Sequence, residues 1–395
     1  MDEAVVETIR QSLKEHLKED SLAALSRGEG LRFEPAPYSC LNQVCIVSSE
    51  DGSQSCIVKL YLNHVKFLGP EEAIETERCR REYDASRHFR SVVPNCCPVI
   101  YFCDDSSSLV CMENLTSHRL WGETLQTSCD LHLGAKIADS LVSLHSQSHQ
   151  TNMAAEEFSK LADSFRALPQ QTNFLCHTHF VKPFREEHRK NKDLADAVRA
   201  KLDEVVQDEV VTRAKSLAHE WMSVGAGECC IHGDLHALSV MVKEEAGDVK
   251  FIDTECARIG PAAFDVALLV CYYVIMYHHH QDLSHREGGG ASDNTDHAQL
   301  MTDTLDLICI TLSRYMEGMS RALATKFDKH QTWRQILLYL GVEIIAWISG
   351  PPSVACVESL PDAQLNCLNT ALRILHRQSL SLDTKGLSRL IHNQA

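Results

Sequence analysis

The sequence predicts an α+β protein of two lobes, a small antiparallel sheet with one helix followed by a larger, mainly helical part. Three observations predict this class. The chain has 395 residues, more than the roughly 100 to 200 of a typical domain. Runs of β-branched residues separated by turn residues dominate only before residue 115, whereas apolar residues at three- and four-residue steps dominate afterwards. We therefore expect an N-lobe at residues 1–115 and a C-lobe at 116–395.

The N-lobe strands are predicted from two segments. The first, QVCIVSSEDGSQSCIVKLYL at 43–62, places two β-branched runs around a turn at Glu50–Ser53, which is typical of a hairpin. The second, PVIYFCDDSSSLVCMENL at 98–115, places two more around Asp104 and Asp105. The charged segment 71–90 between them is predicted as a helix. Together they give an antiparallel sheet with one inserted helix.

Helical spacing characterises the C-lobe. Apolar residues recur on one helical face in two segments: Leu133, Ile137, Leu141 and Leu144, then Leu365, Leu368, Leu372 and Leu375. A short hairpin at 239–253 interrupts the helices. The longest apolar run, 266–277, is too short to cross a bilayer, which needs about 20 residues, and is predicted as a buried helix. The histidine-rich segment 278–297 is predicted as a mobile surface loop, with metal capture by its histidine triplet as the alternative.

Charge and cysteine content restrict the partners and the compartment. A formal net charge of -16 repels nucleic acid and anionic membranes, so neither is expected as a partner. A phosphorylated ligand would then require metal ions or a few local cations. The 17 cysteines are odd in number and lack paired CxxC spacing, and the charged, amphipathic N-terminus does not resemble a signal peptide. These features predict reduced thiols and a cytoplasmic location.

Three acidic residues mark a candidate site at the C-lobe hairpin. Asp234 precedes the first strand of the hairpin, Asp253 ends the second, and Glu255 follows two residues later. If the chain stays extended there, Asp253 and Glu255 point to the same side and repel each other unless a cation lies between them. Mg²⁺ takes one or two carboxylates plus substrate phosphates, which leaves Asp234 to orient a hydroxyl and accept its proton. The alternative is a turn capped by Asp234 with the other two carboxylates exposed to solvent.

The motifs around these residues resemble a known family. HGDLH at 232–236, DTE at 253–255 and GPAAFD at 260–265 resemble the catalytic core of the aminoglycoside-phosphotransferase branch of the protein-kinase-like fold. Within that branch they most resemble methylthioribose kinases, which share Ser at the position of Ser239 and an Asp-x-Glu metal motif. The resemblance covers roughly residues 30–380. It implies a bilobal protein-kinase-like fold with ATP and Mg²⁺ as cofactors.

The resemblance also implies roles for single residues. Lys59 in CIVKLYL would hold the nucleotide phosphates, with Glu82 as its ion-pair partner and Glu77 as a second candidate. Backbone groups in LVCMENL would receive the adenine, Asp234 would align the acceptor hydroxyl as the catalytic residue, and Asp253 and Glu255 would bind Mg²⁺. The cofactor-binding set is therefore Lys59, Glu82, Glu113, Leu115 and Ser239.

Several positions depart from the family pattern. The loop that covers the phosphates is usually glycine-rich, but Tyr38–Gln43 contains no glycine. A twin arginine of methylthioribose kinases is replaced by Ala346 and Trp347, which removes two guanidinium groups from the acceptor side. Arg258 stands where the family prefers an aromatic residue. It either restores one positive charge to the site or points outward at the surface.

The combined sequence evidence predicts an enzyme, a phosphotransferase with an alcohol group as acceptor. The resemblance implies 5-methylthioribose as the preferred substrate, which would become 5-methylthioribose 1-phosphate in methionine salvage. Two alternatives stay open: a kinase of another small hydroxylated metabolite, and a nucleotide-binding pseudokinase that serves as a scaffold. The expected partner is a small molecule, and a homodimer is expected from the resemblance alone.

Overall fold

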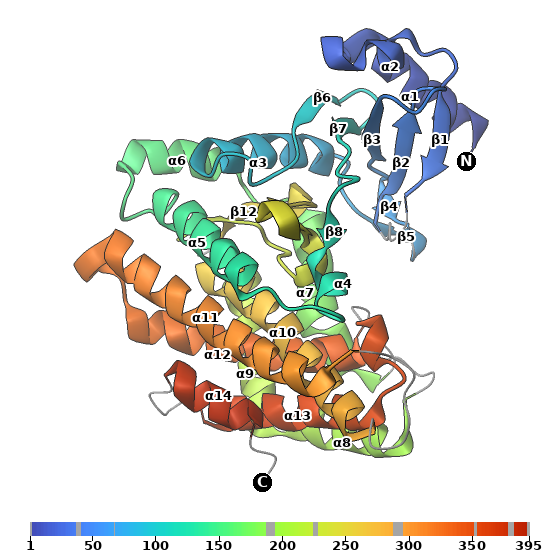
Figure 1. Cartoon of the computed structure of the whole chain (residues 1–395). Helices are drawn as coiled ribbons and strands as arrows, with labels where there is room; N and C mark the ends of the chain where they lie inside the picture. Colours follow the sequence, from blue (N-terminus) through green and yellow to red (C-terminus); the bar gives the residue numbers. More distant parts are fainter. Residues whose placement is uncertain are drawn as a thin grey trace. The chain divides into compact units, whose positions relative to one another are not determined.

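The computed structural model describes residues 2–36, 41–66, 68–186, 194–223, 228–286, 295–350, 354–377 and 383–392. They fall into two compact units (Figure 1). Unit 1 is formed by Met1–His118 with two later segments, Leu168–Gln171 and Lys250–Ala257. Unit 2 is formed by Arg119–Ala167, Thr172–Val249 and Arg258–Ala395. The chain passes from unit 2 back into unit 1 at Lys250, within the hairpin predicted at residues 239–253.

Unit 1 is built on an antiparallel sheet in the order β1-β2-β3-β7-β6 (Figure 1). The strands are β1 (Arg32–Pro35), β2 (Gln43–Ser48), β3 (Ser55–Leu60), β6 (Ile100–Asp104) and β7 (Leu109–Glu113), and a separate small pair is formed by β4 (His64–Val65) and β5 (Gly69–Ala73). Ser48 pairs with Ser55 across the first hairpin, and Asp104 pairs with Leu109 across the second. Both predicted hairpins are therefore confirmed. β1 lies at the edge of the sheet and was not predicted, because its four residues are too short for a period to show.

Helices cover both faces of this sheet. α1 (Glu3–His16) and α2 (Ala23–Arg27) pack on one face, where Leu13 and Leu25 share a core with Val47 and Val58. α3 (Arg78–Val92) faces the other side through Cys79, which clusters with Val110 and Met112. The helix predicted over 71–90 begins later than expected, because β5 takes residues up to Ala73. All cysteines that the structure describes are free thiols.

Unit 2 is mainly helical. Its helices are α4 (Trp121–Thr124), α5 (Leu131–Gln147), α6 (Ala155–Ser164), α7 (Pro169–Phe180), α8 (Asp196–Gln207), α9 (Glu209–Ser223), α10 (Ala262–Arg286), α11 (His297–Leu323), α12 (Lys329–Ser349), α13 (Pro361–His376) and α14 (Thr384–His392). Its short strands are β8 (Arg119–Leu120), β9 (Cys229–Ile231), β10 (Val240–Lys243), β11 (Asp248–Phe251) and β12 (Arg258–Gly260), although the first residues of α7 and the last two of β11 are grouped with unit 1. β9 pairs with β12, and β8 pairs with β10. The α+β class is confirmed.

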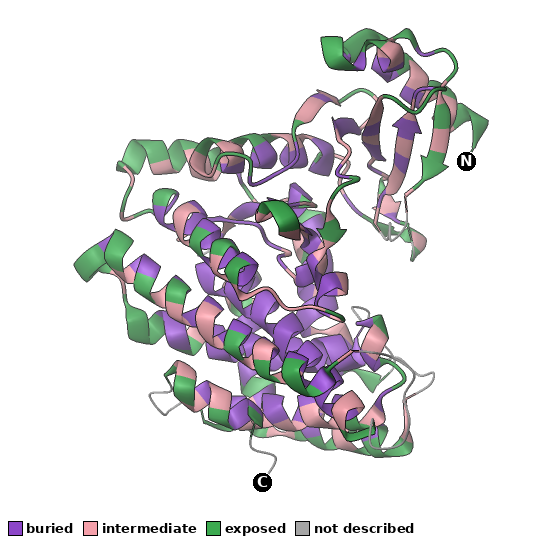
Figure 2. Ribbon diagram, viewed as in Figure 1, coloured by how far each residue is buried: buried purple, intermediate pink, exposed green. Residues whose placement is uncertain are grey.

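α10 forms the core of unit 2 and packs against α11, α12 and α13. Figure 2 shows it buried over most of its length. It is long and apolar enough to cross a membrane, but its most apolar window is completely buried inside the protein. The predicted buried helix over 266–277 is therefore confirmed and extends further in both directions.

The histidine-rich segment corrects the sequence interpretation. His278, His279 and His280 are buried in the last turns of α10, and His297 begins α11, so the predicted surface loop is wrong at both ends; residues 287–294 lie outside the described ranges. His280 Nδ1 lies 3.0 Å from His297 Nδ1. Burial lowers the pKa of each histidine of the triplet to about 4, so these side chains pack as neutral rings. The helical periodicity of this segment is not visible in the sequence, because a helix that is buried on every side need not show an apolar stripe along one face.

Candidate active site

Lys59 is the centre of a buried charge cluster in unit 1. Its Nζ lies 2.7 Å from Glu82 Oε2 on α3, 2.7 Å from Asp253 Oδ1 and 3.4 Å from Glu255 Oε1. Burial opposes the charge of Lys59, but the carboxylates of Asp253, Glu255 and Glu82 outweigh this effect and raise its pKa well above the ordinary value. Strand β3 thus presents a permanently charged ammonium group toward the segment that follows β11.

The ion pair between Lys59 and Glu82 is held on both sides. Tyr61 donates its hydroxyl to the same Glu82 oxygen. Thr254 donates its hydroxyl to the Glu82 carbonyl at 3.3 Å. Glu77, the second candidate partner for Lys59, is exposed at the N-terminus of α3. The structure therefore brings Glu82, and not Glu77, to the lysine.

Glu255 is bound differently from Asp253. Its Oε1 accepts a hydrogen bond from Asn42 Nδ2 at 2.8 Å, and its Oε2 accepts one from Arg78 Nη1. Arg78 is completely buried and also donates to Asn42 Oδ1 at 2.9 Å and to the Leu62 carbonyl at 3.0 Å. Both Glu255 oxygens are thus occupied, whereas the Asp253 side chain contacts Lys59 and is 51% exposed. Asp253 is the carboxylate that is open to a metal ion.

The backbone at Asp253 corrects one premise of the sequence argument. Asp253 has a φ of +59°, in the left-handed region, and Thr254–Cys256 form a 3₁₀ turn. The chain is therefore not extended there, and the two-residue spacing does not by itself place both carboxylates on one side. They converge because the turn wraps around Lys59. A non-glycine residue held in this conformation is strained, which is common at ligand sites.

The two predicted adenine contacts lie at the end of β7 (Glu113) and just after it (Leu115). The Glu113 amide donates to the Val99 carbonyl at 2.8 Å, and the Glu113 carboxylate accepts from the Val99 amide at 3.0 Å. Leu115 is buried, and its carbonyl accepts from the His118 amide at 2.9 Å. Among the described residues, no acceptor meets the Leu115 amide. This backbone N–H is therefore available to donate a hydrogen bond to an acceptor atom of a ligand.

Asp234 lies in unit 2, in the loop between β9 and the 3₁₀ turn Ala237–Ser239. Asp265 at the start of α10 fixes this loop, because its Oδ2 accepts from the His232 amide at 2.7 Å and its Oδ1 from the Gly233 amide at 2.9 Å. Gly233 has a φ of +83°, which lets the chain turn sharply just before Asp234. His145 Nε2 on α5 lies 3.2 Å from Asp265 Oδ2. The position of Asp234 therefore depends on a buried carboxylate behind it.

We expect Asp265→Asn to destabilise unit 2 by about 2 kcal/mol at neutral pH, because hydrogen bonds to a charged acceptor contribute about 1.5–3 kcal/mol. Burial raises the pKa of Asp265, but His145, His232 and the Gly233 amide lower it overall. A lowered folded-state pKa stabilises the fold above the unfolded value of about 3.9 and loses this effect as pH falls through the folded pKa. Denaturant melts of both proteins should therefore differ at pH 7, and the difference should shrink steadily as the pH is lowered below about 4. A constant difference across this range would contradict the role.

The surroundings of Asp234 are aromatic and polar. His236 Nε2 lies 3.9 Å from Asp234 Oδ1, and the His236 ring packs 5.2 Å from Trp347 on α12. Ser239 is buried and donates its hydroxyl to the Asp234 carbonyl at 2.9 Å. The Ser239 hydroxyl thus supports the catalytic loop, while its predicted role in cofactor binding stays a prediction. The loop Tyr38–Gln43, which departs from the family pattern because it lacks glycine, is described only from residue 41 onward, since residues 37–40 lie outside the described ranges.

Arg258 is neither at the surface nor directed outward. It is 4% exposed, and its guanidinium donates to the Met222 carbonyl at 3.2 Å and to Thr172 Oγ1 at 3.2 Å. The expectation of an outward-pointing arginine is therefore wrong. Strand pairing explains this, because Arg258 lies opposite Ile231 between β12 and β9.

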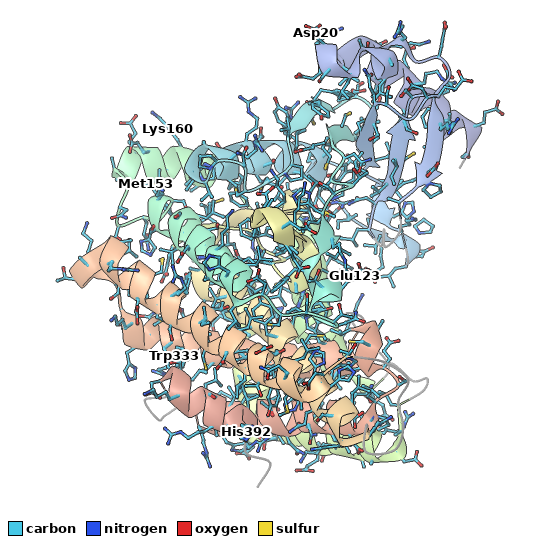
Figure 3. The ribbon with its side chains drawn as sticks, in the orientation of Figure 1. Asp20, Glu123, Met153, Lys160, Trp333 and His392 are labelled. Atoms are coloured by element: carbon cyan, nitrogen blue, oxygen red, sulfur yellow. The ribbon has the colours of Figure 1, made fainter. Side chains whose placement is uncertain are left out.

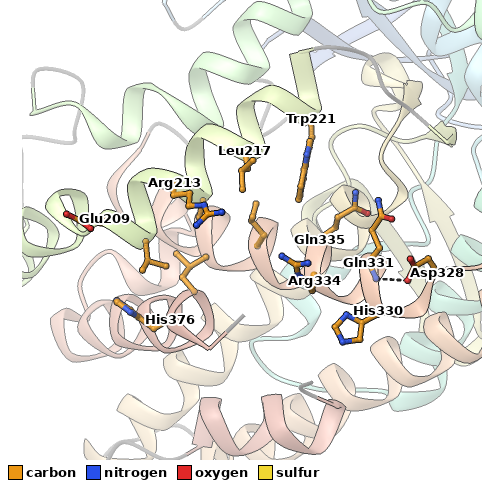
Figure 4. A pocket seen from close by; sticks show the side chains of 14 residues that line it. Glu209, Arg213, Leu217, Trp221, Asp328, His330, Gln331, Arg334, Gln335 and His376 are labelled. Atoms are coloured by element: carbon orange, nitrogen blue, oxygen red, sulfur yellow. Dashed lines mark hydrogen bonds between the residues drawn. The ribbon is translucent and has the colours of Figure 1, made fainter. Parts of the chain in front are cut away.

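A groove of about 840 Å³ opens elsewhere in unit 2, between α9 and α12 (Figure 4). Arg213 and Trp221 from α9 and Arg334 from α12 point into it. None of the predicted site residues lines this groove. The candidate active site is therefore defined by its side-chain geometry and not by the size of a cavity.

Sequence reasoning gave no role to two residues that shape the site. Arg78 precedes Glu82 by four residues, so both lie on the same face of α3 and reach the same carboxylate cluster. Asn42 belongs to the loop Tyr38–Gln43, which contains no glycine. The spacing of Arg78 and Glu82 was visible in the sequence, whereas the bond from Asn42 to Glu255 crosses 213 positions and has no local signal.

The chain is similar to several known proteins. The sequence pattern of the phosphotransferase enzyme family matches residues 35–300. A methylthioribose kinase from Geobacillus kaustophilus is 27% identical over 272 residues, 66% of each chain. One from Pectobacterium carotovorum is 26% identical over 352 residues, 85% of this chain and 84% of that protein. Among solved structures, choline kinase from Cryptosporidium parvum aligns over 98% of this chain and 97% of its own, with 13% identity and a TM-score of 0.49.

Proposed function

The chain belongs to the phosphotransferase enzyme family, and from this premise we propose that it is an ATP-dependent kinase that phosphorylates a sugar hydroxyl. The proposed substrate is 5-methylthioribose and the product 5-methylthioribose 1-phosphate, a step of methionine salvage. Both relatives described above carry the name methylthioribose kinase. The observation that carries the proposal is the buried contact of Lys59 with Glu82 and Asp253, which is the arrangement that orients a phosphate-binding lysine.

The residues present fit a magnesium ion and a nucleotide. The cluster has two cations, Lys59 and Arg78, against the three carboxylates of Glu82, Asp253 and Glu255. Asp253 presents a half-exposed carboxylate, the oxygen ligand that Mg²⁺ prefers. We propose that Asp253 would hold the ion as its main ligand, while Glu255, the second residue predicted as a ligand, would contribute little to metal binding because both of its oxygens already accept hydrogen bonds. When bound, Mg²⁺ neutralises charge on the nucleotide phosphates.

The chain's own groups would carry the other steps. Lys59 holds the phosphates of ATP, and backbone groups of Glu113 and Leu115 receive the adenine. Asp234 orients the acceptor hydroxyl and takes its proton. The hydroxyl oxygen bonds to the γ-phosphorus as the bond from that phosphorus to the bridging oxygen breaks, and ADP leaves with the electron pair. Positioning and charge neutralisation supply most of the rate in this chemistry.

The test is turnover with a panel of acceptors. Purified protein is incubated with Mg-ATP and 5-methylthioribose, ribose, ethanolamine or no acceptor, and ADP release is followed. We expect release only with the sugars and fastest with 5-methylthioribose. Turnover of ethanolamine alone would favour a kinase of another small hydroxylated metabolite. This is the first alternative because Ala346 and Trp347 on α12 replace the twin arginine of methylthioribose kinases on the acceptor side. A protein that turns over no acceptor, although ATP raises its Tm, would be the pseudokinase scaffold.

The charge and the cysteines bear on the cellular location and the partners of the enzyme. We propose a cytoplasmic enzyme with a small-molecule substrate and no nucleic-acid or membrane partner, which the free thiols and the net charge of -16 support. The homodimer, expected from family resemblance, stays a prediction that light scattering tests.

A further inference from the structure

One face of α12 presents polar groups at every fourth residue. Tyr339, Glu343 and Trp347 follow each other at this spacing, so their side chains lie along one side of the helix. Glu343 is completely buried, and its Oε2 lies 2.8 Å from His179 Nδ1 on α7. Its other oxygen, Oε1, and the indole nitrogen of Trp347 are buried without a hydrogen-bond partner among the described residues. A buried polar atom without a partner calls for an explanation, often a missing ligand or water.

These two atoms belong to the surroundings of Asp234. Trp347 packs against the His236 ring, and His236 Nε2 lies 3.9 Å from Asp234 Oδ1. Glu343 is one helical turn before Trp347, and the charge of Asp234 acts on its partner His179. All of these residues lie in unit 2. The face of α12 that ends at Trp347 therefore runs toward the proposed catalytic aspartate.

The chemistry of the unpaired atoms restricts what would satisfy them. Glu343 Oε1 only accepts hydrogen bonds, and the Trp347 N–H only donates them. A hydroxyl group does both, whereas an ammonium group can satisfy the carboxylate but cannot accept from the indole. An anionic group would be repelled by Glu343 and Asp234. Arg258, whose charge acts on His179, already donates to the Met222 carbonyl and to Thr172.

We infer that Glu343 and Trp347 form the acceptor-recognition subsite, which binds a neutral polyol through one hydroxyl that donates to Glu343 Oε1 and one that accepts from Trp347 Nε1. This inference rests on the proposed function and narrows its substrate class. His179 holds Glu343 in place: burial opposes its protonation, but Glu343 and Asp234 raise its pKa above the ordinary value.

The test separates binding from turnover. Calorimetry in the presence of a non-hydrolysable ATP analogue and Mg²⁺ measures binding of 5-methylthioribose, ribose, ethanolamine and ribose 5-phosphate. We expect only the two uncharged sugars to bind. Trp347→Phe and Glu343→Gln should each weaken sugar binding about tenfold, the effect of roughly one well-placed hydrogen bond. The matched control is Trp333→Phe, because Trp333 near the start of α12 (Figure 3) also has a buried, unpartnered indole nitrogen but lies far along the helix from Trp347.

Monodeoxy analogues of ribose provide the sharper comparison. The analogue that lacks the hydroxyl bound by Trp347 should bind wild type and Trp347→Phe equally, while the others lose affinity in the variant. If Trp347→Phe binds every sugar as tightly as Trp333→Phe does, or if ethanolamine or ribose 5-phosphate binds more tightly than ribose, the inference is wrong. Sugar binding that follows these rules without ADP release on adding ATP would instead refute the proposed function and leave the subsite standing. Melting temperatures show whether Glu343→Gln is folded; if it is not, Trp347→Phe alone decides.

Discussion

Asp234→Asn should lower kcat by about 10³-fold while the KM for ATP changes less than twofold. The substitution keeps the size of the side chain but removes the base that would accept the hydroxyl proton, and general-base catalysis typically contributes about 10²- to 10⁴-fold. The backbone anchors of the loop, which run from the His232 and Gly233 amides to Asp265, do not involve the Asp234 carboxylate. The fold and the nucleotide groups on Lys59 should therefore stay intact. Initial rates at saturating acceptor, with ATP varied, measure both constants.

Asp139→Asn is the matched control. Asp139 is an exposed aspartate on α5 whose carboxylate pairs with Arg314 on α11. Exposed pairs of this kind contribute at most about 1 kcal/mol to stability, so this variant should keep wild-type kinetics. If Asp234→Asn retained more than a tenth of the wild-type kcat, the proton would have to leave by another route, and Asp234 would serve only to position the acceptor.

The two hairpins and the main helices follow from local signals. The turn at Glu50–Ser53 and the apolar runs beside it suffice to set the register of β2 and β3, because a one-residue slip would turn Val47 and Val58 out of the core. The stripe on α5 is likewise explicit, since Leu133, Ile137 and Leu141 are all buried. On α13 the buried face is rotated slightly: Leu368 and Leu375 are buried, whereas the other two predicted leucines are only partly so. Local periodicity therefore finds an element more reliably than its exact buried face.

Features that depend on distant contacts were not accessible in this way. The sequence does not reveal that Lys250–Ala257 pack with the first 118 residues, because that grouping is made by bonds such as those from Asn42 and Arg78 to Glu255. The loop prediction for the histidine triplet is wrong for a related reason. Its polarity indicates a loop, but His278 Nδ1 is paired with Gln281 in the same helix and His278 Nε2 with Thr370 on α13, which lies 92 positions away in the sequence.

Asp253→Asn and Glu255→Gln should separate two roles that the sequence assigned together. Asp253→Asn removes a half-exposed carboxylate, so we expect a normal Tm but a rise in the Mg²⁺ concentration needed for half-maximal rate, on the order of 10²-fold, since Mg²⁺ is held by only one or two carboxylates. Glu255→Gln leaves the fully buried Arg78 without its charged partner. Loss of one member of a buried ion pair costs about 3–5 kcal/mol, so this variant should show a strong fall in Tm.

The two measurements cross-check each other. Mg²⁺ titrations of ATP turnover and denaturant melts are run on both variants, with Glu77→Gln as the control on the exposed end of α3. If Glu255 is chiefly a ligand, its variant will melt like wild type and lose Mg²⁺ affinity as Asp253→Asn does. If instead both variants melt normally and keep their Mg²⁺ requirement, the cluster around Lys59 is not a metal site. If Asp253 binds the ion and Glu255 holds Arg78, Asp253→Asn should lose Mg²⁺ affinity and Glu255→Gln should lose stability. No other combination of results supports this division of roles.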